Sequence, residues 1–152
     1  TDSAPAILTA MTTHATRSSF LFLTLGSAVV LAGLSGLAQG RKAGDGVYSA
    51  EQATRGAGAY EKACASCHMA DLRGEGFAPA LNGDAFSLRW ETGKLGDLIK
   101  IVKGTMPADN PNSLTAGEYA DIVAFMLKAN GYPAGQALSE TPNDSAQIGF
   151  GK

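Results

Sequence analysis

Apolar and small side chains recur at helical spacing in three segments of the chain. The first segment opens on Ser49-Ala-Glu-Gln52, a capping box in which each end residue binds the main-chain amide of the other. The positions on one face of the helix after this box are Ala53, Gly56, Ala57, Tyr60 and Cys64. Gly56 and Gly58 are poor helix formers, so we expect at least one of them to permit close approach of another helix.

Two further helices are predicted downstream. From Thr92 to Gly104 the apolar positions fall on one face, and Gly104 is placed to act as the C-terminal cap. These positions are Leu95, Leu98, Ile99 and Val102. A second capping box, Thr115-Ala-Gly-Glu118, opens a helix that we expect to end around Asn130-Gly131. Its apolar positions are Tyr119, Ile122, Val123, Phe125, Met126 and Leu127.

The other stretches between residues 47 and 152 lack periodicity. Residues 69–83 are rich in glycine and too irregular for a helix, so they should form a loop. Pro107 prevents the preceding helix from continuing through Met106, because the residue before a proline disfavours the α conformation. Residues 133–152 contain Pro, Gly, Ser and Asp without a repeat and are predicted to form an extended surface tail. The pattern predicts an all-α fold.

Residues 1–40 match an N-terminal extension followed by an export signal. Residues 1–10 precede the first methionine, Met11, and a polar stretch then leads into an apolar run from Phe20 to Ala38. Small residues at its end predict cleavage after Ala38 or Gly40. The run is also long enough for a membrane anchor. The pair Arg41-Lys42 lies on the side that an anchor would translocate, which favours a cleaved signal.

Length and charge limit the class of protein. A chain of 152 residues is long enough for one ordinary domain and too short for two substantial ones. Its 12 Lys and Arg against 14 acidic residues give a formal net charge of −2, and no basic stripe is visible. We therefore expect no nucleic-acid partner, because phosphate contacts need clustered positive charge.

The chemistry of the chain is concentrated in Cys64-Ala-Ser-Cys67-His68. A C-x-x-C-H sequence attaches one c-type haem, whose iron takes the histidine as proximal ligand. Because this attachment takes place outside the bacterial cytoplasm, it agrees with the export signal. A zinc site would need two more soft ligands, whereas the chain has only these two Cys and one other histidine, His14. A redox disulfide would need a thioredoxin-like setting of strands, and a structural disulfide would close too small a loop to stabilise much.

The order of these elements resembles the class I mono-haem cytochrome c family over about residues 47–132. The resemblance implies a cytochrome c fold of three to five short helices wrapped around one covalently attached haem. It implies Met106 as the distal sulfur ligand of the iron. Pro79 matches the residue whose carbonyl accepts the His68 Nδ1 proton, and Leu81 matches an apolar residue on the proximal haem face.

The same resemblance extends to residues that pack or line the haem. Gly56 and Tyr60 match positions of the first helix that cross the last helix near Phe125. Trp90 and Arg89 lie near the place where an indole or guanidinium often hydrogen-bonds a haem propionate in this family. The alternatives are simple packing for Trp90 and a solvated charge for Arg89.

Three segments are similar to a narrower group, the cytochrome domains that accompany or are fused to pyrroloquinoline-quinone-dependent alcohol dehydrogenases. These segments are residues 84–90, 106–114 and 119–135. The likeness implies a dehydrogenase as electron donor. Related cytochromes also serve other periplasmic dehydrogenases and terminal oxidases, so the donor stays open at this point.

The predicted function is a periplasmic electron carrier and not an enzyme. A haem held by His68 and Met106 would pass single electrons from a periplasmic dehydrogenase to the respiratory chain, through brief contacts with redox partner proteins. Two alternatives stay open. One is a haem sensor whose distal position binds a small ligand, although the presence of Met106-Pro107 argues against it. The other is a subunit of a larger respiratory complex, anchored in the membrane by residues 20–38.

Overall fold

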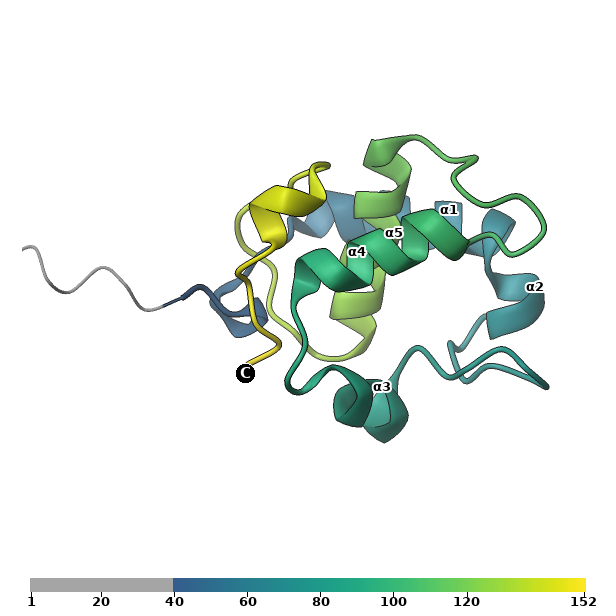
Figure 1. Ribbon diagram of the computed structural model, residues 1–152, viewed down its shortest axis with the longest axis horizontal. Coiled ribbons are helices and arrows are strands. Elements are labelled where there is room, and N and C mark those ends of the chain that lie inside the picture. The colour runs from purple at the N-terminus through teal and green to yellow at the C-terminus, as the bar shows by residue number, and fades with distance from the viewer. Residues whose placement is uncertain (1–39) are drawn as a thin grey trace, which may run out of the picture. The chain divides into compact units, whose positions relative to one another are not determined.

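Figure 1 shows the computed structural model of the chain, which describes residues 40–152. The export signal or anchor predicted within residues 11–40, and the extension before it, fall almost entirely outside the described residues. Among residues 40–152, no helix is both long enough and apolar enough to cross a membrane.

The described residues form five α-helices and two short 3-10 helices, joined by loops (Figure 1). In chain order they are η2 (Ala43–Asp45), α1 (Ala50–Ala63), α2 (Ala65–His68), α3 (Gly83–Trp90), α4 (Leu95–Thr105), α5 (Ala116–Ala129) and η3 (Pro142–Ser145). Between residues 40 and 152, extended pairing is limited to isolated bridges from Gly149 to Lys42 and to Lys94. The predicted all-α fold is confirmed.

Both predicted capping boxes are present. The Gln52 amide donates to Ser49 Oγ at 3.2 Å, and the Ser49 amide donates to Gln52 Oε1 at 3.1 Å. At the start of α5, the Glu118 amide donates to Thr115 Oγ1 at 3.2 Å, and the Thr115 amide donates to Glu118 Oε2 at 2.8 Å. These bonds satisfy amides that a helix N-terminus otherwise leaves unpaired, so they fix where α1 and α5 begin.

α1 and α5 pack in direct backbone contact at Gly56. A Cβ atom at this position would stand 1.8 Å from the carbonyl oxygen of Asp121, which is closer than any side chain allows. The rings of Tyr60 and Phe125 pack beside the contact with their centroids 5.2 Å apart. On the solvent side, Arg55 donates to both carboxylate oxygens of Asp121 at 2.7 Å. The predicted close approach of a second helix is confirmed for Gly56.

α4 extends past the residue that was expected to cap it. Gly104 lies inside the helix, and the predicted cap at Gly104 is wrong. Thr105 is the last helical residue, and its hydroxyl supports this extra position by donating to the Ile101 carbonyl at 2.7 Å. The cap is Met106, whose backbone is extended with φ −126° and ψ 151°. Pro107 therefore ends the helix as predicted.

α3 is a helix that the periodicity does not predict. Its buried residues are Phe86 and Trp90, one helical turn apart, whereas Leu88 between them is 69% exposed. Two apolar anchors in so short a segment do not distinguish a helix from a loop. By forming, the helix places both aromatic side chains in the core.

Residues 133–152 are not the exposed tail that their composition predicts. Leu138, Ile148 and Phe150 are buried in the core, which therefore extends beyond residues 47–132. The Gln52 side chain accepts from the Leu138 amide at 2.7 Å and donates to the Leu138 carbonyl at 2.9 Å. The prediction failed because the apolar residues of this segment are too widely and irregularly spaced to form a helical or strand repeat.

Phe150 anchors the end of this segment in an aromatic cluster. Its ring centroid lies 5.5 Å from Trp90, 5.9 Å from Phe86 and 6.2 Å from Tyr132. Just before it, the Gly149 carbonyl accepts from the Ala43 amide at 2.8 Å, and Ala43 is fully buried. The beginning and the end of the described chain are thus part of one core.

We expect Gly56→Ala to lower the free energy of unfolding by about 1–3 kcal/mol, because the added methyl group must push α1 away from α5. Urea unfolding of the purified protein measures the change. Gly58→Ala is the matched control in the same helix, since a Cβ atom there meets nothing within 4 Å. The control should gain up to about 1 kcal/mol from helix propensity. Equal effects of the two substitutions would contradict the importance of the contact.

Candidate haem site

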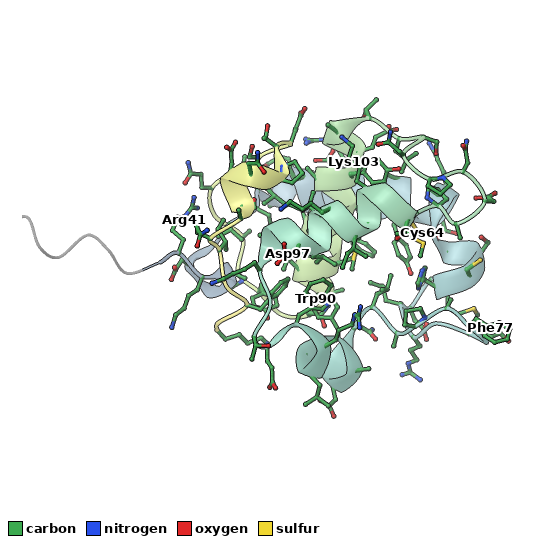
Figure 2. The ribbon with its side chains drawn as sticks, viewed as in Figure 1. Arg41, Cys64, Phe77, Trp90, Asp97 and Lys103 are labelled. Carbon is green, nitrogen blue, oxygen red and sulfur yellow. The ribbon has the colours of Figure 1, made fainter. Side chains whose placement is uncertain are left out.

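The attachment motif lies where α1 ends and α2 begins. Cys64 caps α1 by donating its amide to the Tyr60 carbonyl at 2.8 Å, and its own φ of −130° breaks the helix. The amides of Cys67 and His68 then both turn back to the Cys64 carbonyl, at 3.2 and 2.9 Å. This single tight turn holds both thiols and the imidazole on one short segment, which begins at Cys64, labelled in Figure 2.

The two thiols differ in environment and are both free. Cys67 is exposed, whereas Cys64 is half-buried, and burial raises the pKa of the Cys64 thiol to about 11, with Cys67 adding a smaller effect. Cys64 is therefore protonated at neutral pH, whereas disulfide exchange would need the thiolate. Within residues 40–152 there is also no group of three His, Cys, Asp or Glu side chains that could hold a metal ion. The raised pKa of Cys64 disfavours the redox alternative, and the lack of a ligand group within residues 40–152 disfavours the zinc alternative.

His68 is buried and has a defined tautomer. Its Nδ1 lies 2.9 Å from the Pro79 carbonyl, which can only accept, so Nδ1 carries a proton and Nε2 is the nitrogen left to bind iron. The chain returns to His68 through Gly74, whose amide donates to the His68 carbonyl at 3.0 Å. Gly74 has φ +71°, and a Cβ atom there would stand 2.3 Å from the Ala78 carbonyl oxygen. The loop thus needs glycine at this position to bring Pro79 to the imidazole.

The loop between α2 and α3 is attached to the core at several points. The Tyr60 hydroxyl donates to the Met69 carbonyl at 2.8 Å. Burial, with smaller effects from Cys64 and nearby carboxylates, raises the pKa of Tyr60 to about 12, so this phenol remains a donor at neutral pH. Further along, buried Leu72 accepts from the Leu81 amide at 2.7 Å, and Leu81 packs partly buried against the core.

Asn130 is a residue of the site that the sequence identifies only as a helix end. Its side-chain amide donates to the Leu81 carbonyl at 2.9 Å and to the Met126 carbonyl at 2.8 Å. Its side-chain oxygen accepts from the Gly83 amide at 3.1 Å. Asn130 therefore joins the end of α5 to the loop that carries Pro79, a role that no local pattern indicates.

Met106 comes from a different element, the C-terminus of α4. It is half-buried, and its amide and carbonyl are both hydrogen-bonded, to the Val102 carbonyl at 2.9 Å and the Tyr119 hydroxyl at 2.8 Å. Of the other methionines in the described residues, Met126 is fully buried in the core and Met69 is 38% exposed. Met106 is thus the described methionine whose side chain lies neither in the core cluster nor on the open surface.

Trp90 packs in the aromatic cluster with Phe150. It is 8% exposed, and the Arg89 guanidinium lies 5.7 Å from its ring centroid, in the range of a cation–π contact. Figure 2 shows Trp90 between α4 and α3. Arg89 is therefore associated with the ring, and a propionate contact by either residue stays a prediction.

These residues fit a covalently attached haem. Two thiols are available at the required spacing, and the imidazole that follows them bonds to Pro79 through Nδ1, which leaves Nε2 for iron. Such an imidazole is the ligand form that iron needs, and the carbonyl partner fixes its orientation. A helical fold with this motif defines the class of c-type cytochromes.

The comparisons with known proteins agree with this class. The family model described as cytochrome c oxidase, cbb3-type, subunit III matches residues 51–126, half of the 152-residue chain, and the chain belongs to this family. The chain therefore has the all-α cytochrome c fold, and its cofactor is covalently attached haem c. It is an electron-transfer protein that acts with redox partners, and it is not an enzyme. The search of curated proteins and the search of solved structures give no match.

We expect Asn130→Ala to lower the free energy of unfolding by about 1–3 kcal/mol, because it removes two part-buried hydrogen bonds, to the Leu81 and Met126 carbonyls. Urea unfolding of the haem-loaded protein measures this change. Asn82→Ala removes a comparable but exposed bond, to the Asp71 carbonyl at 2.7 Å, and should cost less than about 1 kcal/mol. A larger loss for Asn82→Ala would contradict the role assigned to Asn130.

Proposed function

We propose that this protein carries single electrons in the periplasm through one haem attached at Cys64 and Cys67 and ligated by His68 and Met106. The observation that carries the proposal is the hydrogen bond from His68 Nδ1 to the Pro79 carbonyl within a C-x-x-C-H motif. This bond holds the tautomer in which Nε2 binds iron. Periplasmic location is supported by the export signal predicted for residues 11–40.

The chain's own residues have distinct tasks in this proposal. The two cysteines retain the cofactor covalently, and Pro79 keeps the imidazole oriented in both redox states. Leu81 and Trp90 would supply apolar surface that keeps water from the haem. His68 and Met106 would hold the iron, and the bound haem would supply reversible one-electron chemistry, with a reduction potential raised by thioether ligation.

The surface beside the motif is suited to brief encounters. Phe77 is fully exposed on the loop after α2, at the same end of the molecule as Cys64 (Figure 2). Among the charges of this loop, Asp71 and Arg73 form an exposed ion pair at 3.3 Å and largely neutralise one another, and exposed Glu75 adds one negative charge. A small apolar contact surface without a strong electrostatic field favours rapid docking and release over tight binding.

We infer that the electron donor is a quinoprotein alcohol dehydrogenase. The support is the likeness of residues 84–90, 106–114 and 119–135 to the cytochrome domains that accompany such enzymes. The acceptor would be an oxidase or another cytochrome of the respiratory chain. Electrons would then leave the dehydrogenase one at a time, as a single haem requires.

A second candidate function is that of a subunit in a larger respiratory complex. The observation that favours it is the family match itself, since the family is described as subunit III of a cbb3-type cytochrome c oxidase. In that case residues 20–38 would be kept as an anchor. The haem site would be the same, and the partners would be fixed neighbours within the complex.

We expect the ferric protein to show the weak long-wavelength absorption band of methionine-ligated haem, and Met106→Ala to abolish it by removing the sulfur ligand. Visible spectra of the ferric and ferrous proteins test this. Met69→Leu is the control, because Met69 is exposed and adjoins the proximal histidine. A wild-type protein that is high-spin, or that binds carbon monoxide readily at rest, would contradict the carrier and favour the ligand-binding sensor.

The two proposed settings predict different partners. A purified quinoprotein alcohol dehydrogenase, supplied with alcohol, should reduce the ferric protein in stopped-flow mixing at a rate that depends linearly on its concentration. A quinoprotein sugar dehydrogenase serves as the comparison within the same cofactor class. If neither enzyme reduces the protein, and it is purified from membranes only in detergent together with oxidase subunits, the second candidate is correct.

A further inference from the structure

The segment that carries Met106 has few attachments to the rest of the domain. Residues 106–114 connect α4 to α5 without regular structure. One main-chain bond lies within it, from the Asn110 amide to the Pro107 carbonyl at 3.0 Å. Across residues 40–152, Tyr119 provides the only side-chain hydrogen bonds that this segment makes.

Tyr119 reaches both ends of the segment with one oxygen atom. Its hydroxyl donates to the Met106 carbonyl at 2.8 Å, and the Leu114 amide points to the same oxygen in a longer contact of 3.5 Å. The side chain is 1% exposed, so its direction is set by the core. Tyr119 therefore closes the loop at its first and last residues.

The helix that carries Tyr119 is itself fixed at this point. Tyr119 belongs to the first turn of α5, directly after the capping box of Thr115 and Glu118. Those two residues are joined by three hydrogen bonds, including one from Thr115 Oγ1 to Glu118 Oε2 at 2.8 Å. A fully formed first turn gives the phenol little freedom to follow the loop.

Met106 is consequently held on both sides of its Cα atom. Its amide is bonded to Val102 at the end of α4, and its carbonyl is bonded to Tyr119 at the start of α5. We propose that Tyr119 is a positioning residue for the distal ligand: its hydroxyl restrains the main chain of Met106 and thereby opposes displacement of the thioether from iron. This inference rests on the proposed ligation by Met106.

The other tyrosines of the chain provide matched controls, because each of their hydroxyls also donates to a main-chain carbonyl. Tyr48 donates to Tyr132 at 2.6 Å, and Tyr132 donates to Phe150 at 3.4 Å, both away from the two ligands. Tyr60 donates to Met69, beside His68, where the proposed thioether bonds already hold the chain covalently. A hydroxyl removed from any of these positions therefore leaves the distal ligand unaffected.

The test is titration of the ferric haem-loaded protein with imidazole, which competes with Met106 for iron. Tyr119→Phe keeps the buried ring and removes only the donor, so we expect imidazole to bind about tenfold more tightly than to the wild type. Tyr48→Phe, Tyr60→Phe and Tyr132→Phe should stay within about twofold of the wild type. The free energy of unfolding of each variant is measured alongside, to separate a local change from general loosening.

The outcomes distinguish the inference from the proposed function. If the wild type shows the methionine-ligation band but Tyr119→Phe binds imidazole like the three controls, the positioning role is overturned and Met106 ligation stands. An equal rise in all four variants also overturns it, because the effect would then follow stability alone. If the wild type lacks the band, the proposed ligation and this inference fall together.

A second variant covers the case in which Tyr119→Phe does not fold. Thr115→Ala removes the cap of α5 and loosens the turn that carries Tyr119, while the hydroxyl itself remains. It should tighten imidazole binding in the same direction. Ser49→Ala, which removes the matching cap of α1, is its control and should leave imidazole binding unchanged. Equal responses to the two substitutions would overturn the inference.

Discussion

The direct packing of α1 on α5 at Gly56 is the contact on which the candidate site depends. The backbone of α1 lies against the Asp121 carbonyl because no side chain stands between the helices. Beyond this contact α1 leads through α2 to His68, whereas α5 carries Tyr119 in its first turn and is followed by Asn130. The two helices thus form a frame whose ends support both sides of the site, and a displacement at the contact would move those sides relative to each other.

The two sides are held by different kinds of restraint. On the side of His68, the proposed thioether bonds add covalent links to a histidine already oriented by Pro79. On the side of Met106, hydrogen bonds of ordinary strength act on the main chain alone. Under the proposed ligation, small free-energy differences would decide whether Met106 stays bound to iron, whereas the thioether links would keep His68 beside it. The role proposed for Tyr119 follows from this asymmetry, because its buried hydroxyl is one of the few restraints on the main chain of Met106.

The sequence predicted the frame well and its surroundings poorly. α1 and α5 were predicted with their caps because capping boxes and helical periodicity are local signals. The cost of glycine in a helix predicted a close contact at Gly56 or Gly58, and the family resemblance indicated Gly56. The packing of Phe150 and the tether formed by Asn130 were missed because they join residues far apart in the chain. Patterns within a helix reveal which face is buried, but they do not reveal which distant segment covers it.

The two ends of the described domain lie together, and this has a consequence for how the protein can be attached to other structures. Ala43 and Gly149 are joined by a main-chain hydrogen bond, and Figure 2 shows Arg41 at the opposite end of the molecule from Cys64 and Phe77. A membrane anchor or a fused domain at either terminus would therefore be attached at the end of the domain opposite the haem motif. The end with the haem motif would then face away from the tether, so the tether would not cover the docking surface. The distance over which this end could meet a partner would be set by the length of the linker.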